Sequence, residues 1–441
     1  MKYVTLFCLA SIVTMMLAVF CEVTFAQDPG TAPEFYELTL ELGLEHSDNR
    51  ARTDPPGSSE TAVVPRMTLD MSRSGQRVTL RAAGHADLRL PQDGPFDNEF
   101  RANLAGRLNW HLIEESLDWI VENVTSGAPL DLTDQDTPDN RQQTNVFSTG
   151  PRWIIRPAAP WSGLLDARYI HSYAEDSDAF NSDRLALGAR ALRRLGGGRQ
   201  LSAGVEATEV RYREDEFASA DYQRYDLVGR YRARRAALDM DIAAGRTRID
   251  LDRGEQFEGN LVRLRLVRTI DDRHTLVASA GHELSDSVRQ LAADIEQLDL
   301  PIAASRQLPI GNEFYVLDNV SLGWRYRQAL LDGSVTVAWR DYQYELDPLL
   351  DIEEQAIHLG LTWRLDPTMA LEGGIGLDRR RFRITEQRDT DARLSLFLVR
   401  QFNPRWSGRI GAVHFRRDSN IVGEDSRENI VAVYLAYHAG R

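Results

Sequence analysis

The sequence has little cysteine and lacks long apolar runs beyond its N-terminus. Of the 441 residues only two are cysteine, Cys8 and Cys21. The chain after Cys21 therefore has no thiol for a disulfide bond, a thiolate metal site or a cysteine nucleophile. No segment after the first 26 residues offers 18 consecutive apolar residues, which argues against a transmembrane helix.

Lysine is nearly absent, because Lys2 is the only one and every other basic residue is arginine. The net charge of −14 argues against a nucleic-acid partner, since such proteins show a basic patch or stripe. Two explanations of the arginine bias stay open. It reflects a GC-rich genome, or it reflects the use of guanidinium forks that pair bidentately with carboxylates in a confined space.

The first 26 residues have the pattern of a secretory signal peptide. Lys2 precedes the apolar run Tyr3–Phe20, and Thr24 and Ala26 occupy the −3 and −1 positions of a cut before Gln27. A membrane anchor is the alternative. We predict a cleaved leader over 1–26, which leaves residues 27–441 as the mature chain.

The rest of the chain alternates apolar and polar residues with a period of two, which is typical of a β-strand with two different faces. In the stretch 36–45, for example, Tyr36 and every second residue after it are apolar, while Glu37, Glu41 and Glu45 lie between them. About 20 such stretches of roughly 12–15 residues follow one another. They exceed the usual soluble strand and suit tilted strands that cross a bilayer and project beyond it.

The connections between these stretches alternate in length. Short ones are expected near 73–75, 113–115, 157–160, 195–198, 234–236, 271–272, 330–333, 366–367 and 403–404, and long polar ones near 49–60, 91–97, 127–142, 175–182, 214–220, 251–256, 287–312, 347–352, 385–388 and 419–426. This pattern predicts that residues 27–441 form one all-β domain, an up-and-down antiparallel transmembrane β-barrel of about 18–20 strands. We expect it in a Gram-negative outer membrane, with short turns in the periplasm, long loops outside the cell and the surrounding lipid as a partner. Every tryptophan lies within about six residues of an expected short turn, as an interfacial aromatic belt predicts.

Charged residues on the second face are candidates for lining the lumen. By alternation this set comprises Glu37, Glu41, Glu45, Arg77, Arg81, Asp87, Arg101, Arg107, Arg152, Arg168, Arg224, Asp226, Arg230, Arg232, Arg364, Glu372 and Asp378. They form either a salt-bridged lining without a transport role or a water-filled conduit whose charges select what passes. The same alternation turns several aromatic residues inward, where they guide a sugar chain or fill space: Tyr212, Tyr222, Tyr342, Tyr344, Phe382 and Tyr434.

Two of the long loops differ from the others. Segment 287–312 has Val288, Leu291 and Ile295 at helix-like spacing, which predicts a short amphipathic helix that acts as a constriction in the mouth or as a surface lid. Segment 127–142 is rich in aspartate, but it lacks the glycine and terminal glutamate of an EF-hand. A solvated acidic loop is therefore the expectation.

The sequence contains no enzyme motif, and we expect no catalytic residue, no cofactor and no metal site. The adjacent residues His171 and Ser172 face opposite ways on a strand, as do His282 and Glu283. His85 shares a face with Asp87 but has no supporting motif.

Two short segments resemble a family of outer-membrane β-barrels that accompanies the PEP-CTERM/exosortase system and its exopolysaccharide gene clusters. These are the Asp48-Asn49 pair and the stretch 140–152, which reads NRQQTNVFSTGPR. The resemblance implies a porin-type role beside polysaccharide synthesis or export, with polysaccharide and periplasmic export proteins as partners, and it brings no catalytic residues. Such barrels often end on an aromatic residue, whereas here Tyr437 is followed by four more residues.

The leading hypothesis is therefore a non-enzymatic, porin-like conduit or accessory component of exopolysaccharide export. Three alternatives stay open: a structural or adhesive barrel with a plugged lumen, an outer-membrane hydrolase, and a soluble all-β protein. Conductance across a planar bilayer distinguishes the conduit from the plugged barrel, since a plugged barrel passes no stable current.

Overall fold

A computed structural model describes residues 35–158, 160–297 and 310–440. The leader predicted over 1–26 lies outside these residues. The strands are β1 (Phe35–Ser47), β2 (Glu60–Ser74), β3 (Val78–Pro91), β4 (Glu99–Ile113), β5 (Leu117–Pro129), β6 (Arg141–Ala158), β7 (Trp161–Ala174), β8 (Ser182–Gly196), β9 (Arg199–Tyr212), β10 (Tyr222–Arg235), β11 (Leu238–Leu251), β12 (Gln256–Thr269), β13 (His274–Asp286), β14 (Phe314–Arg327), β15 (Leu331–Tyr344), β16 (Ile352–Asp366), β17 (Met369–Phe382), β18 (Arg388–Asn403), β19 (Trp406–Ser419) and β20 (Ser426–Gly440). The helical segments are η1 (Pro138–Asn140), η2 (Asp178–Phe180), η3 (Asp215–Ala220), α2 (Ser287–Gln297) and η4 (Pro348–Leu350).

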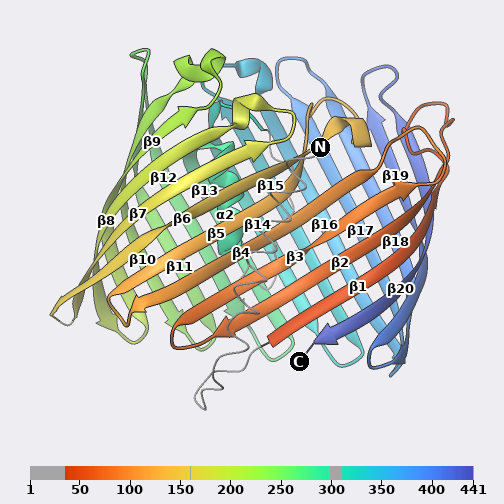
Figure 1. Cartoon of the computed structure of the whole chain (residues 1–441), viewed down its shortest axis with the longest axis horizontal. Coiled ribbons are helices and arrows are strands. Elements are labelled where there is room, and N and C mark those ends of the chain that lie inside the picture. Colours follow the sequence, from red (N-terminus) through yellow and green to blue (C-terminus); the bar gives the residue numbers. More distant parts are fainter. Residues whose placement is uncertain (1–34, 159, 298–309, 441) are drawn as a thin grey trace.

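The strands form one closed antiparallel barrel of 20 strands (Figure 1). Each strand pairs with the next along the chain, and β1 also pairs with β20, where Leu42 lies opposite Leu435. Closure leaves no strand with an unpaired edge, as backbone groups in hydrocarbon require. The strand count at the upper end of the predicted range is confirmed.

Short turns gather at one end of the barrel and long loops at the other, as the connection lengths predicted. Turn 75–77 joins β2 to β3 and turn 404–405 joins β18 to β19, whereas the loops between β1 and β2 and between β13 and β14 are much longer. The start of β1 and the end of β20 both lie at the short-turn end (Figure 1). In the part of the chain described, no helix is both long and apolar enough to cross a membrane.

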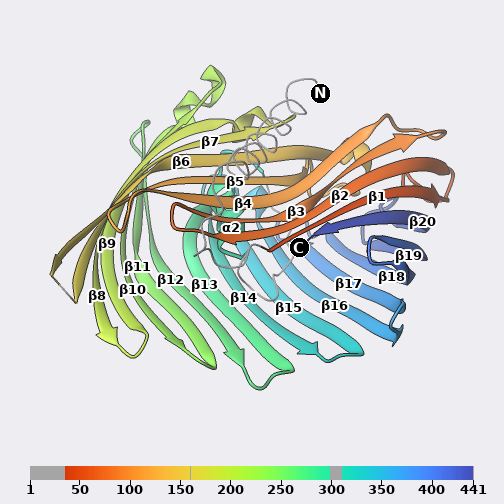
Figure 2. The same ribbon diagram turned by 60° about the horizontal axis from the view of Figure 1, so that its bottom comes forward.

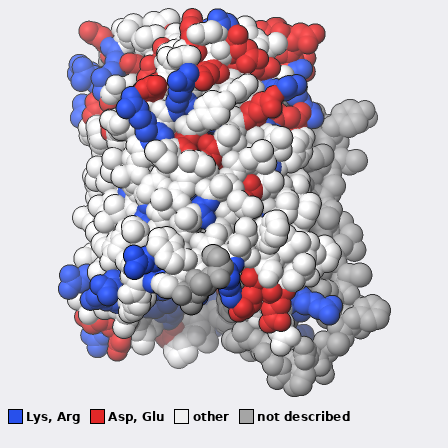
Figure 3. Space-filling model, turned by 90° about the vertical axis from the view of Figure 1, so that its left-hand side faces the viewer, with Lys and Arg blue, Asp and Glu red and all other residues white. Residues whose placement is uncertain are grey.

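The outer surface of the wall is apolar. On β1, Leu40, Leu42 and Leu44 are 45%, 58% and 54% exposed, whereas the intervening Gly43 and Glu45 are buried. Figure 3 shows a largely uncharged band between two charged rims. A soluble protein would turn such leucines inward, so this surface fits contact with lipid.

All eight tryptophans are exposed on the outer surface, by between 36% and 55%. Most of them lie near a short turn. Trp119, for example, is the third residue of β5, which begins directly after a short turn. Trp339 departs from the expectation, because β15 begins at Leu331 and ends at Tyr344, which puts Trp339 nearer the long-loop end. There its indole N–H donates to Glu353 Oε1 at 3.0 Å.

Candidate functional site

The helix α2 enters the barrel from the end of β13. The pairing of β12 with β13 stops at Val262 and His282, and beyond that point Leu284 packs among the inward-facing side chains of neighbouring strands. Asp286 then holds the first turn of α2, because its Oδ1 accepts hydrogen bonds from the backbone N–H groups of Val288 and Arg289 at 3.1 and 3.2 Å. The same carboxylate lies 2.7 Å from Arg184 Nη1 on β8.

The apolar face of α2 packs against a different part of the wall. Val288, Leu291 and Ile295 form one buried cluster with residues of β5, β6, β7 and η2, namely Val124, Val146, Ala174 and Phe180. Strands β6 to β12 separate β5 from β13 around the ring, so a helix that touches both has to lie in the lumen (Figure 2). The sequence left two positions open for this helix, a constriction or a surface lid. In the structure the helix lies inside the barrel and narrows the lumen.

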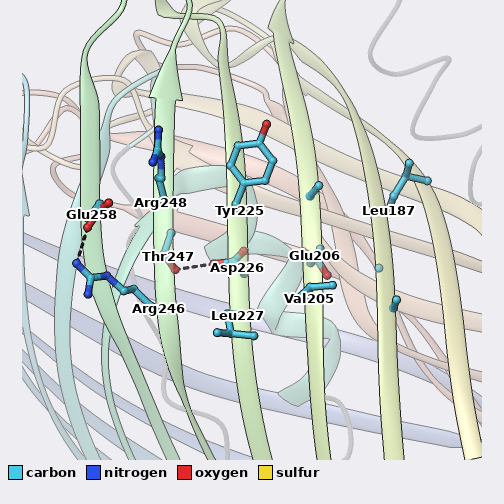
Figure 4. Close-up of a pocket in the computed structure, with 13 residues that line it drawn as sticks. Leu187, Val205, Glu206, Tyr225, Asp226, Leu227, Arg246, Thr247, Arg248 and Glu258 are labelled. Atoms are coloured by element: carbon cyan, nitrogen blue, oxygen red, sulfur yellow. Dashed lines mark hydrogen bonds and ion pairs between the residues drawn. The ribbon is translucent and has the colours of Figure 1, made fainter.

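The polar face of α2 joins a third part of the wall. Arg289 Nη1 lies 3.2 Å from Asp226 Oδ2 on β10 and 3.4 Å from Glu206 Oε1 on β9. Asp226 also accepts from Arg224 at 2.8 Å and from Thr247 at 2.5 Å, a contact drawn in Figure 4. The predicted lumen residue Asp226 is therefore an anchor of the helix, and Arg224, also predicted, holds Asp226 in place.

A second insert, the loop 130–140, reaches across part of the long-loop end. Within the loop 130–140, Asn140 accepts from the Asp131 N–H at 2.8 Å and donates to the carbonyl oxygens of Asp131 and Gln135. The loop reaches β17–β19, where Arg380 donates to the Leu132 carbonyl and Arg417 to the Thr133 and Asp134 carbonyls. Like α2, this loop thus connects separate parts of the wall.

Charges around this loop are compensated. Arg141 lies 2.5 Å from Asp136 Oδ1 and 3.3 Å from Glu99 Oε1. Burial alone would raise the pKa of Asp136, but the guanidinium groups of Arg141, Arg52 and Arg50 outweigh it and hold this pKa well below its usual range. Burial, together with the neighbouring guanidinium groups of Arg141 and Arg89, lowers the pKa of Arg50 to about 10, so Arg50 remains charged at neutral pH.

The segments that carry the family resemblance lie in the same region. Asp48 accepts two hydrogen bonds from Asn429 on β20, both 2.7 Å, and the Asn49 side chain donates to the carbonyl oxygens of Thr53 and Arg427. The second segment begins with Asn140 and Arg141, which hold the loop 130–140. Asp48-Asn49 and the start of stretch 140–152 therefore organise the long-loop end, while the rest of that stretch follows β6 across the wall to Arg152.

Most of the predicted lumen residues pair with a charge on the inner wall. Glu41 pairs with Arg409, Glu45 with Arg89, Arg81 with Asp70, Asp87 with Arg101, Arg107 with Glu122, Arg152 and Arg168 with Asp166, Arg230 and Arg232 with Asp241, and Asp378 with His358. Four others differ. Arg77 lies in the turn 75–77, Glu37 is exposed at the start of β1, Arg364 donates to the Ala329 carbonyl near a short turn, and Glu372 is half-buried on β17.

The aromatic residues predicted to turn inward are all buried, and they fill space. Tyr212 and Tyr222 belong to one apolar cluster, and Tyr342, Tyr344 and Phe382 belong to another. Tyr434 donates a hydrogen bond to Glu45, and the guanidinium carbon of Arg409 lies 4.1 Å from the centroid of the Tyr434 ring. Their burial leaves no open aromatic track in this part of the lumen.

Several buried charges were missed by alternation alone. Glu60, Asp389 and Glu428 are almost fully buried near the long-loop end. Glu428 accepts from Ser47 and Arg52, and Asp389 accepts from Arg417 at 2.7 Å. Glu60, Asp389 and Glu428 lie at or next to strand ends, which the sequence pattern delimits least well.

The adjacent pairs His171-Ser172 and His282-Glu283 do not form catalytic dyads. His171 Nδ1 lies 2.9 Å from Asp183 Oδ1 on the outer face, whereas Ser172 bonds Ser182 on the inner face. His282 likewise pairs with Asp318 rather than with Glu283. Among the described residues, no group of three or more histidines, cysteines or carboxylates is placed to hold a metal ion.

A groove of about 580 Å³ lies on the outer wall across β8–β12. The exposed side chains of Leu187, Val205, Leu227 and Tyr225 line it, with Arg246 and Glu258 paired beside it (Figure 4). It is separated from the lumen by the sheet, where Asp226 and Thr247 face the other way.

Comparison with known proteins gives only distant structural matches. No family model and no curated protein matches the sequence. A ferric enterobactin receptor (PfeA) mutant from Pseudomonas aeruginosa is 12% identical, with a TM-score of 0.46 over 93% of this chain and 81% of that one. The FrpB iron transporter from Neisseria meningitidis is 8% identical, with a TM-score of 0.40 over 92% of this chain and 81% of that one. Matches this distant carry no argument about cargo.

Proposed function

We propose that the protein is an outer-membrane conduit, of porin type and without enzymatic activity, that serves exopolysaccharide export. The observation that carries the proposal is a closed barrel with an apolar exterior, a charged inner wall and a lumen narrowed by α2. An apolar exterior suits lipid, and a charged interior suits water and polar solutes. The short turns then face the periplasm, where export proteins would dock.

The link to polysaccharide rests on the resemblance of Asp48-Asn49 and of stretch 140–152 to barrels of exopolysaccharide loci. Deleting the gene should reduce surface polysaccharide, measured on intact cells. Re-expression of the wild-type chain should restore it, and so should a chain with Arg235→Gln, a substitution in an exposed position near a short turn. Unchanged polysaccharide in the deletion strain would contradict the link while leaving the conduit itself open to test.

One observation favours a second candidate, a plugged barrel whose function lies in its loops. Two inserts, α2 and the loop 130–140, both occupy the interior or its mouth. A plugged barrel would insert into a planar bilayer and pass no stable current. The same purified protein therefore discriminates between the two candidates.

A further inference from the structure

The inner wall carries a concentration of arginines between the middle of the strands and the short turns. We call this set the arginine belt: Arg152 on β6, Arg168 on β7, Arg190 on β8, Arg230 and Arg232 on β10, and Arg265 on β12. Except for β9, every strand from β6 to β12 contributes to it an arginine or, in the case of β11, the carboxylate of Asp241. The belt therefore spans neighbouring strands of the wall, with an interruption at β9.

The contacts of α2 fix the direction in which the belt faces. Arg289 of α2 touches Asp226, so Arg230 and Arg232, which are separated from it by even steps along β10, also face the lumen. Ile170 packs against the cluster around α2, so Arg168 on the same strand faces inward as well.

Arg190 faces the lumen because its strand pairs in register with β7. It lies opposite Leu164, which is separated from Ile170 by even steps, and opposite residues on paired strands share a face. On the other side it lies opposite Gly204 of β9. The absence of a side chain at Gly204 makes room for the stem of Arg190, because a Cβ there would come within 3.1 Å of Arg190 Cβ and 3.2 Å of Arg190 Cγ.

Cations outnumber anions in the belt. Asp166 serves both Arg152, at 2.6 Å, and Arg168, at 3.3 Å. Asp241 serves Arg230 at 2.5 Å, Arg232 at 2.7 Å and Arg265 at 3.9 Å. Arg190 forms no hydrogen bond or ion pair in the part of the chain that the structure describes.

A guanidinium has five N–H donors in a planar fork. Arg168 spends its donors on Asp166 and on the carbonyl oxygens of Gly150, Pro151 and Ala167. Arg232, in contrast, bonds to Asp241 through its Nε–H, which leaves its terminal N–H donors for another acceptor. Arg232 is the most open of the paired arginines, since 48% of its side chain is exposed. Carboxylate groups of a passing molecule fit the unused donors in bidentate geometry. Neutral sugars lack this charge-assisted contact.

We infer that the arginine belt binds acidic saccharides, in particular chains that contain uronic acids, and that it makes the conduit selective for anions. This inference rests on the proposed conduit function and names the chemical class of its cargo. The belt lies on the short-turn side of the α2 constriction. An acidic chain arriving from that side would meet the belt before the helix.

The first test measures the reversal potential of the purified full chain in a planar bilayer under a KCl gradient. The sign should show a chloride permeability above that of potassium. Arg190→Glu should lower the chloride-to-potassium ratio by roughly twofold, as expected for a change of two unit charges that is screened in a watery lumen. The matched control is Arg193→Glu, which lies on the same strand with its side chain on the outer face and exposed. Cation preference in the wild type would overturn the inference.

The second test measures block of that current by a galacturonic acid oligomer and by a neutral maltodextrin of equal length. The acidic oligomer should block at a lower concentration than the neutral one, and Arg230→Gln with Arg232→Gln should remove most of the difference. Equal block by both oligomers in the wild type would overturn the inference and leave the conduit intact. A folded wild type that passes no current would instead overturn the proposed function.

Discussion

Arg289 of α2 lies 3.2 Å from Asp226 of β10, and this ion pair ties a helix inside the barrel to the wall behind it. Asp226 is 5% exposed and also receives Arg224 and Thr247, so it is the common acceptor for the helix and two strands. A charge buried this deeply is costly once its partners are removed. The pair is therefore the natural place to alter the width of the lumen.

Asp226→Asn should loosen α2 and enlarge the conduit. The neutral amide keeps the shape of the side chain but removes the charge that holds Arg289 and Arg224. We expect a larger mean single-channel conductance and more frequent fluctuations than in the wild type. Asp250→Asn, which removes a carboxylate paired with Arg248 near the end of β11, is the control and should leave both unchanged. An unaltered conductance in Asp226→Asn would show that α2 does not limit the current.

The position of α2 is open to a cross-linking test, because the chain has no cysteine after Cys21. Leu291 on α2 and Val124 on β5 belong to the same buried cluster. Leu291→Cys with Val124→Cys should join on treatment with a short bifunctional thiol reagent, detected as a shift in the mass of a linked peptide. Leu291→Cys with Val413→Cys on β19 should not react, since Val413 lies outside that cluster. The reverse pattern would place the helix elsewhere.

The lipid-facing band predicts a depth-dependent cost for charge. Val320, in the middle of β14, and Leu330, in the next short turn, are 53% and 61% exposed. Val320→Arg should reduce the free energy of unfolding in lipid vesicles by about 2–4 kcal/mol, and Leu330→Arg by about 0–1 kcal/mol. Guanidinium titration of the vesicle-embedded protein measures both. Equal costs at the two depths would contradict the placement of the band.

The loop 130–140 should stay anchored through mildly acidic pH. The pKa of Asp136 in the folded chain is below its unfolded value of about 3.9, so its ion pairs contribute fully above that pH and are lost only as pH falls through the folded value. Rate-corrected hydrogen exchange of residues 130–140 should be the same at about pH 5 and pH 7. Asp136→Asn should accelerate it at both, whereas Asp139→Asn, an exposed residue of the same loop, should not. Slower exchange in Asp136→Asn would contradict this role.

The strand order, the turn positions and the facing of most side chains follow from local rules and were predictable. On β1, alternation alone separates the exposed Leu42 from the buried Glu45, because neighbouring side chains on a strand point to opposite faces. Loop length likewise tells the two ends of the barrel apart. Even the helix near Val288 was visible as a change of period from two to helical spacing.

Contacts across the lumen were not predictable in this way. Nothing in the local pattern says that Leu291 meets Val124, or that Arg417 reaches the carbonyl of Thr133, since these pairs are brought together only by closure of the ring. Trp339 shows the other limit. Its distance from the nearest turn depended on a strand boundary, and the boundary of β15 lies a few residues from where the pattern suggested.

The most direct test of the conduit is single-channel recording of the purified, heat-modifiable full chain in a planar bilayer. Discrete and stable current steps, which increase in size with Asp226→Asn, are the predicted result. A chain that inserts and shows heat-modifiable migration, yet gives no steps either as wild type or as Asp226→Asn, would contradict the account and leave the plugged barrel in its place.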